Sequence, residues 1–317
     1  MMKAEDILAK INDYLGHLPY DRQPSSLYEP VRYVLSLGGK RIRPVLMMKA
    51  YEMWREDGRD VLPQAVALET YHNFTLLHDD VMDHADVRRG KPTVHRKWNE
   101  NTAILSGDNM LLLAVRWMGE KCMSTFIDTA IDINHGQQYD VDFETRNDVT
   151  EQEYIEMIRL KTSVLLGCAV RIGAMMAGAP AEDVESLYRF GEAMGLAFQL
   201  QDDYLDVYGD SAVFGKEIGG DIMCNKKTYM LINALAKAEG DDKAELQRWI
   251  DTVDADRKEK VAAVTAIYNK LGIDRMAKAK MEEYYQVALA ALDQVNVPEE
   301  KKQPLREYAA MMMKRNK

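Results

Sequence analysis

Two copies of one acidic pattern are the part of this 317-residue sequence best suited to chemistry. Each copy reads Asp-Asp-x-x-Asp, at 79–83 and at 202–206, inside an apolar, helix-forming stretch. A helix turns about 100° per residue, so the outer aspartates of each copy lie on one face, about 40° apart. Like charges at this spacing repel, and a divalent cation removes the conflict. Hard oxygen ligands without cysteine favour Mg²⁺, which keeps positions for water and phosphate oxygens.

Other interpretations of these acidic residues are open at this point. The chain has 51 Asp and Glu residues, so either copy alone is equally well interpreted as a solvated helix face. Two copies within apolar helices favour a metal site, and neither has the loop spacing of a calcium-binding EF-hand. Glu69 and His72 have the spacing of di-iron ligands, but the sequence has no second complete copy. We expect His72 to line the same cavity as Asp79 as a hydrogen-bond donor, or to be a core histidine.

The segments that carry these motifs are predicted to be helices. None of the nine prolines lies between Pro92 and Pro180 or between Pro180 and Pro298, and proline is excluded from helix interiors. Helical periodicity recurs over 153–176, 184–207 and 258–292. No linker or repeat divides the chain. We therefore predict an all-α protein with about ten or more helices, in a single domain over residues 1–317.

Charge and cysteine content exclude several classes of protein. The net charge of −10 argues against a nucleic-acid partner, because such binding needs clustered Lys and Arg. Three scattered cysteines without a CxxC pair predict a reducing, cytoplasmic location. The N-terminus lacks the features of a signal peptide, and no run approaches about 18 apolar residues, so no membrane span is expected. An anionic ligand must then be bound by local basic clusters beside glycines, or by metal ions.

Five motifs, in order over residues 25–230, resemble those of the trans-isoprenyl diphosphate synthase, or polyprenyl synthetase, family. They are GGKRIRP at 38–44, HDDVMDHADVRRGKPTVH at 78–95, Lys161-Thr162, FQLQDDYLD at 198–206 and GKEIGGDIMCNKKTY at 215–229. The resemblance implies a single all-α helical bundle around a deep central cavity, usually in a homodimer. It also implies a reaction that joins isopentenyl diphosphate to an allylic diphosphate (dimethylallyl, geranyl or farnesyl).

In that reaction the allylic substrate loses its diphosphate, and isopentenyl diphosphate keeps its own. The resemblance implies Mg²⁺ as cofactor, with about three ions per active site. Its leading ligands would be Asp79, Asp83 and Asp202, with Asp80, Asp203 and Asp206 also in the metal site. The allylic diphosphate would be held by Arg88, Lys161 and Lys216, with Lys226 and Asp221 close behind.

Isopentenyl diphosphate keeps its diphosphate, so its site needs positive side chains that balance the phosphate charge without helping the diphosphate to leave. The residues that match the family's positions for this are Lys40, Arg43, His72 and Arg89. Gln199 and Thr162 would turn their oxygens toward the allylic cation, and Phe198 would pack against the isopentenyl group or belong to the core. Basic residues at the C-terminus are either further phosphate ligands or a solvated tail: Lys314, Arg315 and Lys317. Arg41 is expected to be a surface charge.

Residues one helical turn before the first aspartates set the depth of the pocket in this family. Phe74 is aromatic and Thr75 is small, which resembles the members that make geranylgeranyl diphosphate, with farnesyl diphosphate as the alternative product. A class I terpene cyclase also carries one such acidic motif, but needs only one diphosphate site. A non-catalytic partner subunit typically loses aspartates that are complete here. If the chain were a helical interaction protein with solvated charges, the presence of the five motifs in this order would be a coincidence.

Overall fold

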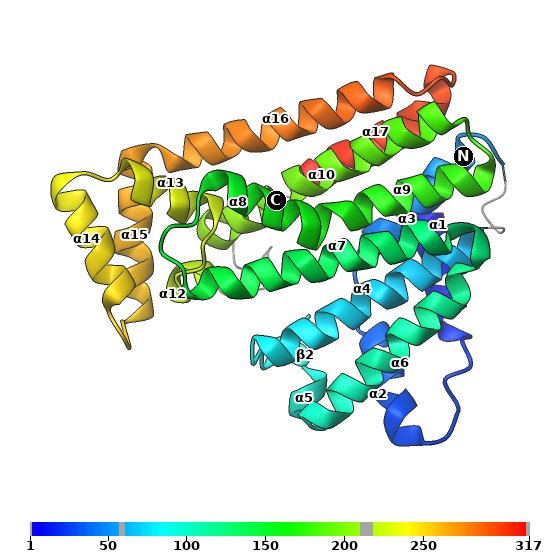
Figure 1. Cartoon of the computed structure of the whole chain (residues 1–317), viewed down its shortest axis with the longest axis horizontal. Coiled ribbons are helices and arrows are strands. Elements are labelled where there is room, and N and C mark those ends of the chain that lie inside the picture. Colours follow the sequence, from blue (N-terminus) through cyan, green and yellow to red (C-terminus); the bar gives the residue numbers. More distant parts are fainter. Residues whose placement is uncertain (1, 57–60, 210–217, 315–317) are drawn as a thin grey trace. The chain divides into compact units, whose positions relative to one another are not determined.

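The computed structural model describes residues 2–56, 61–209 and 218–314, and Figure 1 shows them as helices joined by short loops. The all-α prediction is confirmed. The N-terminal elements are α1 (Ala4–Gly16), α2 (Ser25–Ser36), α3 (Ile42–Glu52), α4 (Leu62–Met82), β1 (Val87–Arg88), β2 (Lys91–Pro92), α5 (Val94–Lys97) and α6 (Glu100–Met118). The central elements are α7 (Glu120–Thr145), α8 (Glu151–Ile158), the π-helical turn η2 (Arg159–Ser163), α9 (Val164–Ala177) and α10 (Ala181–Tyr208). The remaining elements are α12 (Gly220–Met223), α13 (Tyr229–Lys237), α14 (Gly240–Asp251), α15 (Arg257–Leu271), α16 (Ile273–Asp293) and α17 (Glu299–Met313).

The chain packs into two compact units, which are described separately. The first unit contains Met1–Asp128, Cys168–Tyr188 and Gln294–Arg306. The second contains Thr129–Gly167, Arg189–Asp293 and Glu307–Lys317. In the first unit α4 packs against α3 and α6, and in the second unit α13 packs against α8, α15 and α16. The single domain over residues 1–317 stays a prediction.

Helix boundaries follow local chemistry where they depart from the predicted periodicity. The stretch 258–292 forms two helices, α15 and α16, because Gly272 adopts a left-handed conformation (φ 70°) that a residue with a side chain rarely accepts. Its N–H bonds to the carbonyl of Asn269 and ends the first helix. Two prolines do lie beyond the first turn of a helix, Pro30 in α2 and Pro304 in α17.

Among the described residues, one stretch, Glu151–Ala177, is long and apolar enough to cross a membrane by length and composition alone. In the structure 72% of its most apolar window is buried inside the protein. The buried core helix of a water-soluble protein passes the same test, so this stretch is weak evidence for a membrane span. The absence of a span stays a prediction.

Candidate functional site

The first acidic motif closes α4 in the first unit. Asp83 caps the helix, and its N–H donates to the Asp79 carbonyl at 2.8 Å, one turn earlier. The middle aspartate is different, because Asp80 is buried and accepts a hydrogen bond from Arg88 Nε at 2.7 Å. Burial raises the pKa of Asp80 to about 6, against the opposing effect of Arg88. Asp80 is therefore held by the protein, whereas Asp79 is half-buried and Asp83 is exposed.

A tight hairpin places the two arginines that follow this motif. Strands β1 and β2 pair antiparallel, Val87 with Pro92 and Arg88 with Lys91. The two turn residues, Arg89 and Gly90, both have positive φ (52° and 73°), as the favoured two-residue hairpin turn requires. Arg88 thus faces the aspartates, with Nη2 3.8 Å from Asp79 Oδ2 and Nε bonded to Asp80, while Arg89 lies in the turn.

A second group of basic residues in the same unit gathers around α4 and the loop before α3. Nη1 of Arg43 lies 3.0 Å from Nε2 of His72. Because arginine can only donate, His72 accepts at Nε2, and its proton is then on Nδ1. The expectation that His72 acts as a hydrogen-bond donor in the cavity stays a prediction. Burial, then the charges of Arg43 and Arg89, hold the pKa of His72 well below its usual range, so the ring is neutral.

Arg89 is joined to the glycine pair of the first basic motif. Its Nη1 donates to the Gly38 carbonyl. A Cβ on Gly39 would lie 3.0 Å from the Arg89 guanidinium carbon, so a side chain there would displace the guanidinium slightly, and the positive φ of Gly39 (131°) also favours glycine. Lys40 follows this turn as an exposed residue. Arg88 and Arg89 also line a pocket with Asn73 and Asp80. The structure therefore brings His72, Arg43 and Arg89 together, with the Lys40 loop held beside Arg89.

The expectation that Arg41 is a surface charge is wrong. Arg41 is 4% exposed, and its Nη1 lies 2.8 Å from Oε1 of Glu69, which is 2% exposed. The sequence contained one signal for this contact, an acidic residue at an otherwise apolar position of α4. In the sequence, the spacing of Glu69 from His72 resembles that of a metal-ligand pair and so points to a different contact.

The predicted chain-length residues lie one turn before the aspartates, as expected. Phe74 is half-buried, with ring centroids 5.5 Å from Tyr71 and 4.8 Å from His78. Tyr71 in turn packs edge-on against Phe126 at 5.1 Å. The hydroxyl of Thr75 donates to the His72 carbonyl. Their effect on product length stays a prediction.

The second acidic motif lies near the end of α10, in the second unit. Its middle aspartate, Asp203, is buried, and its two carboxylate oxygens accept hydrogen bonds from the Tyr154 hydroxyl and from Gln199 Nε2, the latter at 2.9 Å. The carbonyl oxygen of Gln199 accepts from the Thr162 hydroxyl at 3.0 Å. Burial raises the pKa of Asp203, although Lys226, Tyr154 and Gln199 oppose this. The middle aspartate of both motifs is thus held by protein groups.

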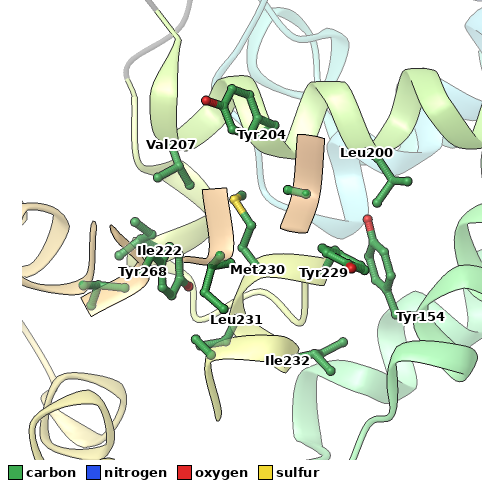
Figure 2. Packing of buried hydrophobic residues seen from close by; sticks show 14 of the residues in the cluster. Tyr154, Leu200, Tyr204, Val207, Ile222, Tyr229, Met230, Leu231, Ile232 and Tyr268 are labelled. Atoms are coloured by element: carbon green, nitrogen blue, oxygen red, sulfur yellow. The ribbon is translucent and has the colours of Figure 1, made fainter. Parts of the chain in front are cut away.

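Tyr154 belongs to a hydrophobic cluster of the second unit. Figure 2 shows it rising from α8 beside Tyr229, below Leu200 of α10, and the two tyrosine ring centroids are 6.5 Å apart. Burial and the Asp203 carboxylate hold the pKa of Tyr154 well above its usual range. Its hydroxyl therefore keeps its proton and donates. This role cannot be predicted from the sequence, because a tyrosine on an apolar helix face is indistinguishable from a core residue.

The outer aspartates of the second motif are half-buried. Asp206 organises the backbone that follows: its carboxylate accepts from the Asp221 N–H at 2.9 Å and its carbonyl from the Gly219 N–H at 2.6 Å. It therefore anchors the start of α12. Phe198, on the same helix, is buried.

Lys161 and Thr162 lie in the π-helical turn η2, a feature frequent at functional sites. Nζ of Lys161 donates to Asp140 of α7 at 2.5 Å. Burial would raise the pKa of Asp140, but Lys226 and Lys161 outweigh it and the pKa lies below its ordinary value. Lys226 thus lies near both Asp140 and Asp203. Lys216, Arg315 and Lys317 lie outside the described residues, and Lys314 is exposed.

Two glycines let neighbouring helices approach this turn. A Cβ on Gly136 of α7 would lie 2.2 Å from the Lys161 backbone nitrogen, and one on Gly195 of α10 would lie 2.5 Å from the Ser163 Cα. Sequence reasoning missed both, together with Asp140. The available signal was glycine in the middle of a predicted helix, which is costly unless packing requires it.

The outer aspartates supply hard oxygen donors, and this donor set fits Mg²⁺. Within residues 2–56, 61–209 and 218–314, no three His, Cys, Asp or Glu side chains gather closely enough to hold a metal ion by themselves. An ion held by one or two carboxylates plus water and phosphate oxygens needs no such group.

Comparison with known proteins agrees with this chemistry. The chain is 45% identical over 229 residues to a geranylgeranyl diphosphate synthase of Methanosarcina mazei, covering 69% of this chain and 70% of that protein. It is 39% identical over 238 residues to a geranylfarnesyl diphosphate synthase of Natronomonas pharaonis, covering 67% and 70%. A crystal structure of a geranylgeranyl pyrophosphate synthase matches with a TM-score of 0.94 and 41% identity over 100% of both chains. Since the model of the polyprenyl synthetase family also matches residues 24–270, this chain belongs to the polyprenyl synthetase family.

Proposed function

We propose that this prenyltransferase condenses isopentenyl diphosphate head-to-tail with an allylic diphosphate, with Mg²⁺ as cofactor, to make geranylgeranyl diphosphate. One observation supports the proposal: the first unit carries an acidic group of side chains and, separately, a basic group. The Asp79 and Asp83 carboxylates suit a diphosphate bound through metal ions, whereas Arg43, Arg89 and neutral His72 suit a diphosphate bound directly. Two kinds of site match a reaction in which one diphosphate leaves and the other stays.

The basic residues and His72 have separate proposed roles at the two diphosphates. Arg43 and Arg89 donate to the diphosphate of isopentenyl diphosphate, with Lys40 adding positive charge at its exposed side. Neutral His72 orients Arg43 and adds no charge of its own. Arg88, Lys161 and Lys216 hold the allylic diphosphate, and Lys226 adds positive charge in support.

The carboxylates of Asp79, Asp83 and Asp202 would hold the metal ions, with Asp206 in support. When bound, Mg²⁺ supplies Lewis-acid stabilisation of the departing diphosphate. Gln199 and Thr162 present oxygens to the developing allylic cation, and Asp203 fixes the Gln199 amide so that its carbonyl end is turned away from the carboxylate. A single domain over residues 1–317 is part of this proposal, and the family match over residues 24–270 supports it.

The working enzyme is proposed to be a cytoplasmic homodimer. Helix α6 exposes apolar side chains that a second copy would cover, with Leu105 60% and Leu112 66% exposed. None of the three cysteines, all of them within the described residues, forms a disulfide. This is what a reducing compartment would give.

The test is incubation of the purified chain with Mg²⁺, isopentenyl diphosphate and each allylic primer, followed by chain-length analysis of the products. We expect geranylgeranyl diphosphate as the main product. This length is supported by the similarity to the geranylgeranyl diphosphate synthase of Methanosarcina mazei and by Phe74 before the first motif. Farnesyl diphosphate as the end product would favour the alternative. Failure to incorporate isopentenyl diphosphate would overturn the proposal and favour a cyclase or a non-catalytic subunit.

A further inference from the structure

A buried ion pair lies beneath the basic group of the first unit. Arg41 and Glu69 are almost completely buried, and their side chains meet at 2.8 Å. Burying two charges costs several kcal/mol of desolvation, so such a pair is weak evidence for stability and raises the question of what else it does. Neither residue is among those assigned above to a substrate or a metal ion.

Arg41 fixes the loop that carries Lys40 and Arg43. It has a left-handed backbone conformation (φ 47°, ψ 39°) at the start of α3, which is uncommon for a residue with a long side chain. The same guanidinium donates to the Leu35 carbonyl at 2.6 Å. The side chain therefore ties the loop to the end of α2 and, through Glu69, to α4.

Asn73 extends this connection to Arg89. Its amide nitrogen donates to Glu69 Oε1 at 2.9 Å and to the Glu69 carbonyl at 2.8 Å. Since a carboxylate can only accept, Glu69 holds the nitrogen end of the amide, and the Asn73 oxygen is turned toward Arg89 Nη1 at 3.4 Å. Arg89 is at the same time bonded to Gly38 in the loop that Arg41 anchors.

We infer that Arg41, Glu69 and Asn73 form a positioning network that assembles the isopentenyl diphosphate site before the substrate arrives. The inference rests on the proposed function. Lys40, Arg43 and Arg89 repel one another, and the Glu69 carboxylate supplies negative charge beneath them without occupying the face that binds phosphate. Loss of the network should weaken binding of isopentenyl diphosphate and leave the allylic substrate, which is bound through other residues, nearly unaffected.

The test compares Glu69→Gln and Asn73→Leu with the wild type. Asn73→Leu keeps the buried ion pair and the branched shape of the side chain, and it removes the amide donor and acceptor. Steady-state KM is measured for each substrate, and binding of isopentenyl diphosphate alone, without Mg²⁺, is measured by calorimetry. We expect Kd and KM for isopentenyl diphosphate to rise about tenfold in each variant, the effect of weakening one charged hydrogen bond, and the allylic KM to change less than about twofold.

Asn233→Leu is the matched control, since Asn233 is also a helical asparagine that donates to the carbonyl one turn earlier, in the second unit. It should leave both KM values unchanged. Equal rises in both KM values, or none, in Asn73→Leu would overturn the inference. If Glu69→Gln fails to fold, as judged by circular dichroism, the KM and Kd values of Asn73→Leu alone decide whether the inference stands. A wild type that does not use isopentenyl diphosphate would instead refute the proposed function.

Discussion

Tyr154 of α8 donates its hydroxyl hydrogen to the buried carboxylate of Asp203, and this contact orients a residue of the proposed reaction centre. The other Asp203 oxygen accepts from Gln199 Nε2, so the Gln199 amide cannot reverse without losing that bond. Its carbonyl oxygen is left to accept from Thr162. Asp203 thus determines which end of the Gln199 amide is turned toward Thr162, and Tyr154 holds the Asp203 carboxylate in place.

Removing this hydroxyl should slow chemistry more than it weakens binding. Tyr154→Phe leaves one Asp203 oxygen buried without its donor, and we expect kcat to fall about tenfold, equivalent to roughly 1.4 kcal/mol. Both KM values should stay within about twofold. The control is Tyr208→Phe, which removes a tyrosine hydrogen bond to Asn269 in the same unit. A fall in kcat that is the same in both variants would contradict the positioning role.

The parts of the site that the sequence predicted are those whose residue types are distinctive. Paired aspartates at helical spacing and basic residues beside glycines can be read from the chain, and the structure places Arg43 with His72 as expected. The partners that hold them could not be read. Tyr154, Asn73 and Asp140 look like ordinary helix residues, and only tertiary packing gives them a contact. The Arg41–Glu69 pair was missed for the same reason, because its members are 28 residues apart.

The outer and middle aspartates of each motif should respond differently to substitution. Asp79→Ala and Asp202→Ala should lower kcat by about 100-fold or more and raise the Mg²⁺ concentration needed for half-maximal rate, because they remove proposed metal ligands. Asp203→Asn should lower kcat about tenfold with an unchanged Mg²⁺ requirement, because Asp203 is bonded to Tyr154 and Gln199. Mg²⁺ titrations of initial rate measure both quantities. Near-normal turnover in the two alanine variants would refute the ligand roles.

Close approach of α7 to the Lys161 turn predicts a strict need for glycine at position 136. A Cβ there would lie 2.2 Å from the Lys161 nitrogen and 2.7 Å from the Leu160 carbonyl carbon, and backbone cannot yield as a flexible side chain can. Gly136→Ala should destabilise the protein by about 1–3 kcal/mol and lower kcat. Gly16→Ala, where nothing lies within 4 Å of the added methyl group, is the control. Urea unfolding and steady-state rates check the prediction, and equal stability of the two variants would contradict it.

The depressed pKa of His72 predicts a pH dependence of stability. An unfolded histidine takes up a proton near pH 6.5, whereas folded His72 resists protonation because of burial and the charges of Arg43 and Arg89. The unfolded state then binds more protons, so this residue lowers the free energy of unfolding as pH falls below about 6.5. His72→Gln keeps an acceptor for Arg43 and should remove that part of the slope. Urea unfolding between pH 5 and 7 measures it, and identical slopes in both proteins would show that His72 protonates normally.

The aromatic layer behind the first motif predicts a limited response of product length. Phe74→Ala should lengthen the product, because it removes the ring that packs between Tyr71 and His78. Tyr71 and Phe126 then form the next barrier, so the gain should stop after about one isoprene unit, which is about as long as one helical turn. Thr75→Phe should shorten the product toward farnesyl diphosphate. Chain-length analysis with each allylic primer checks both variants, and unchanged lengths in the two would mean that another part of the pocket sets the limit.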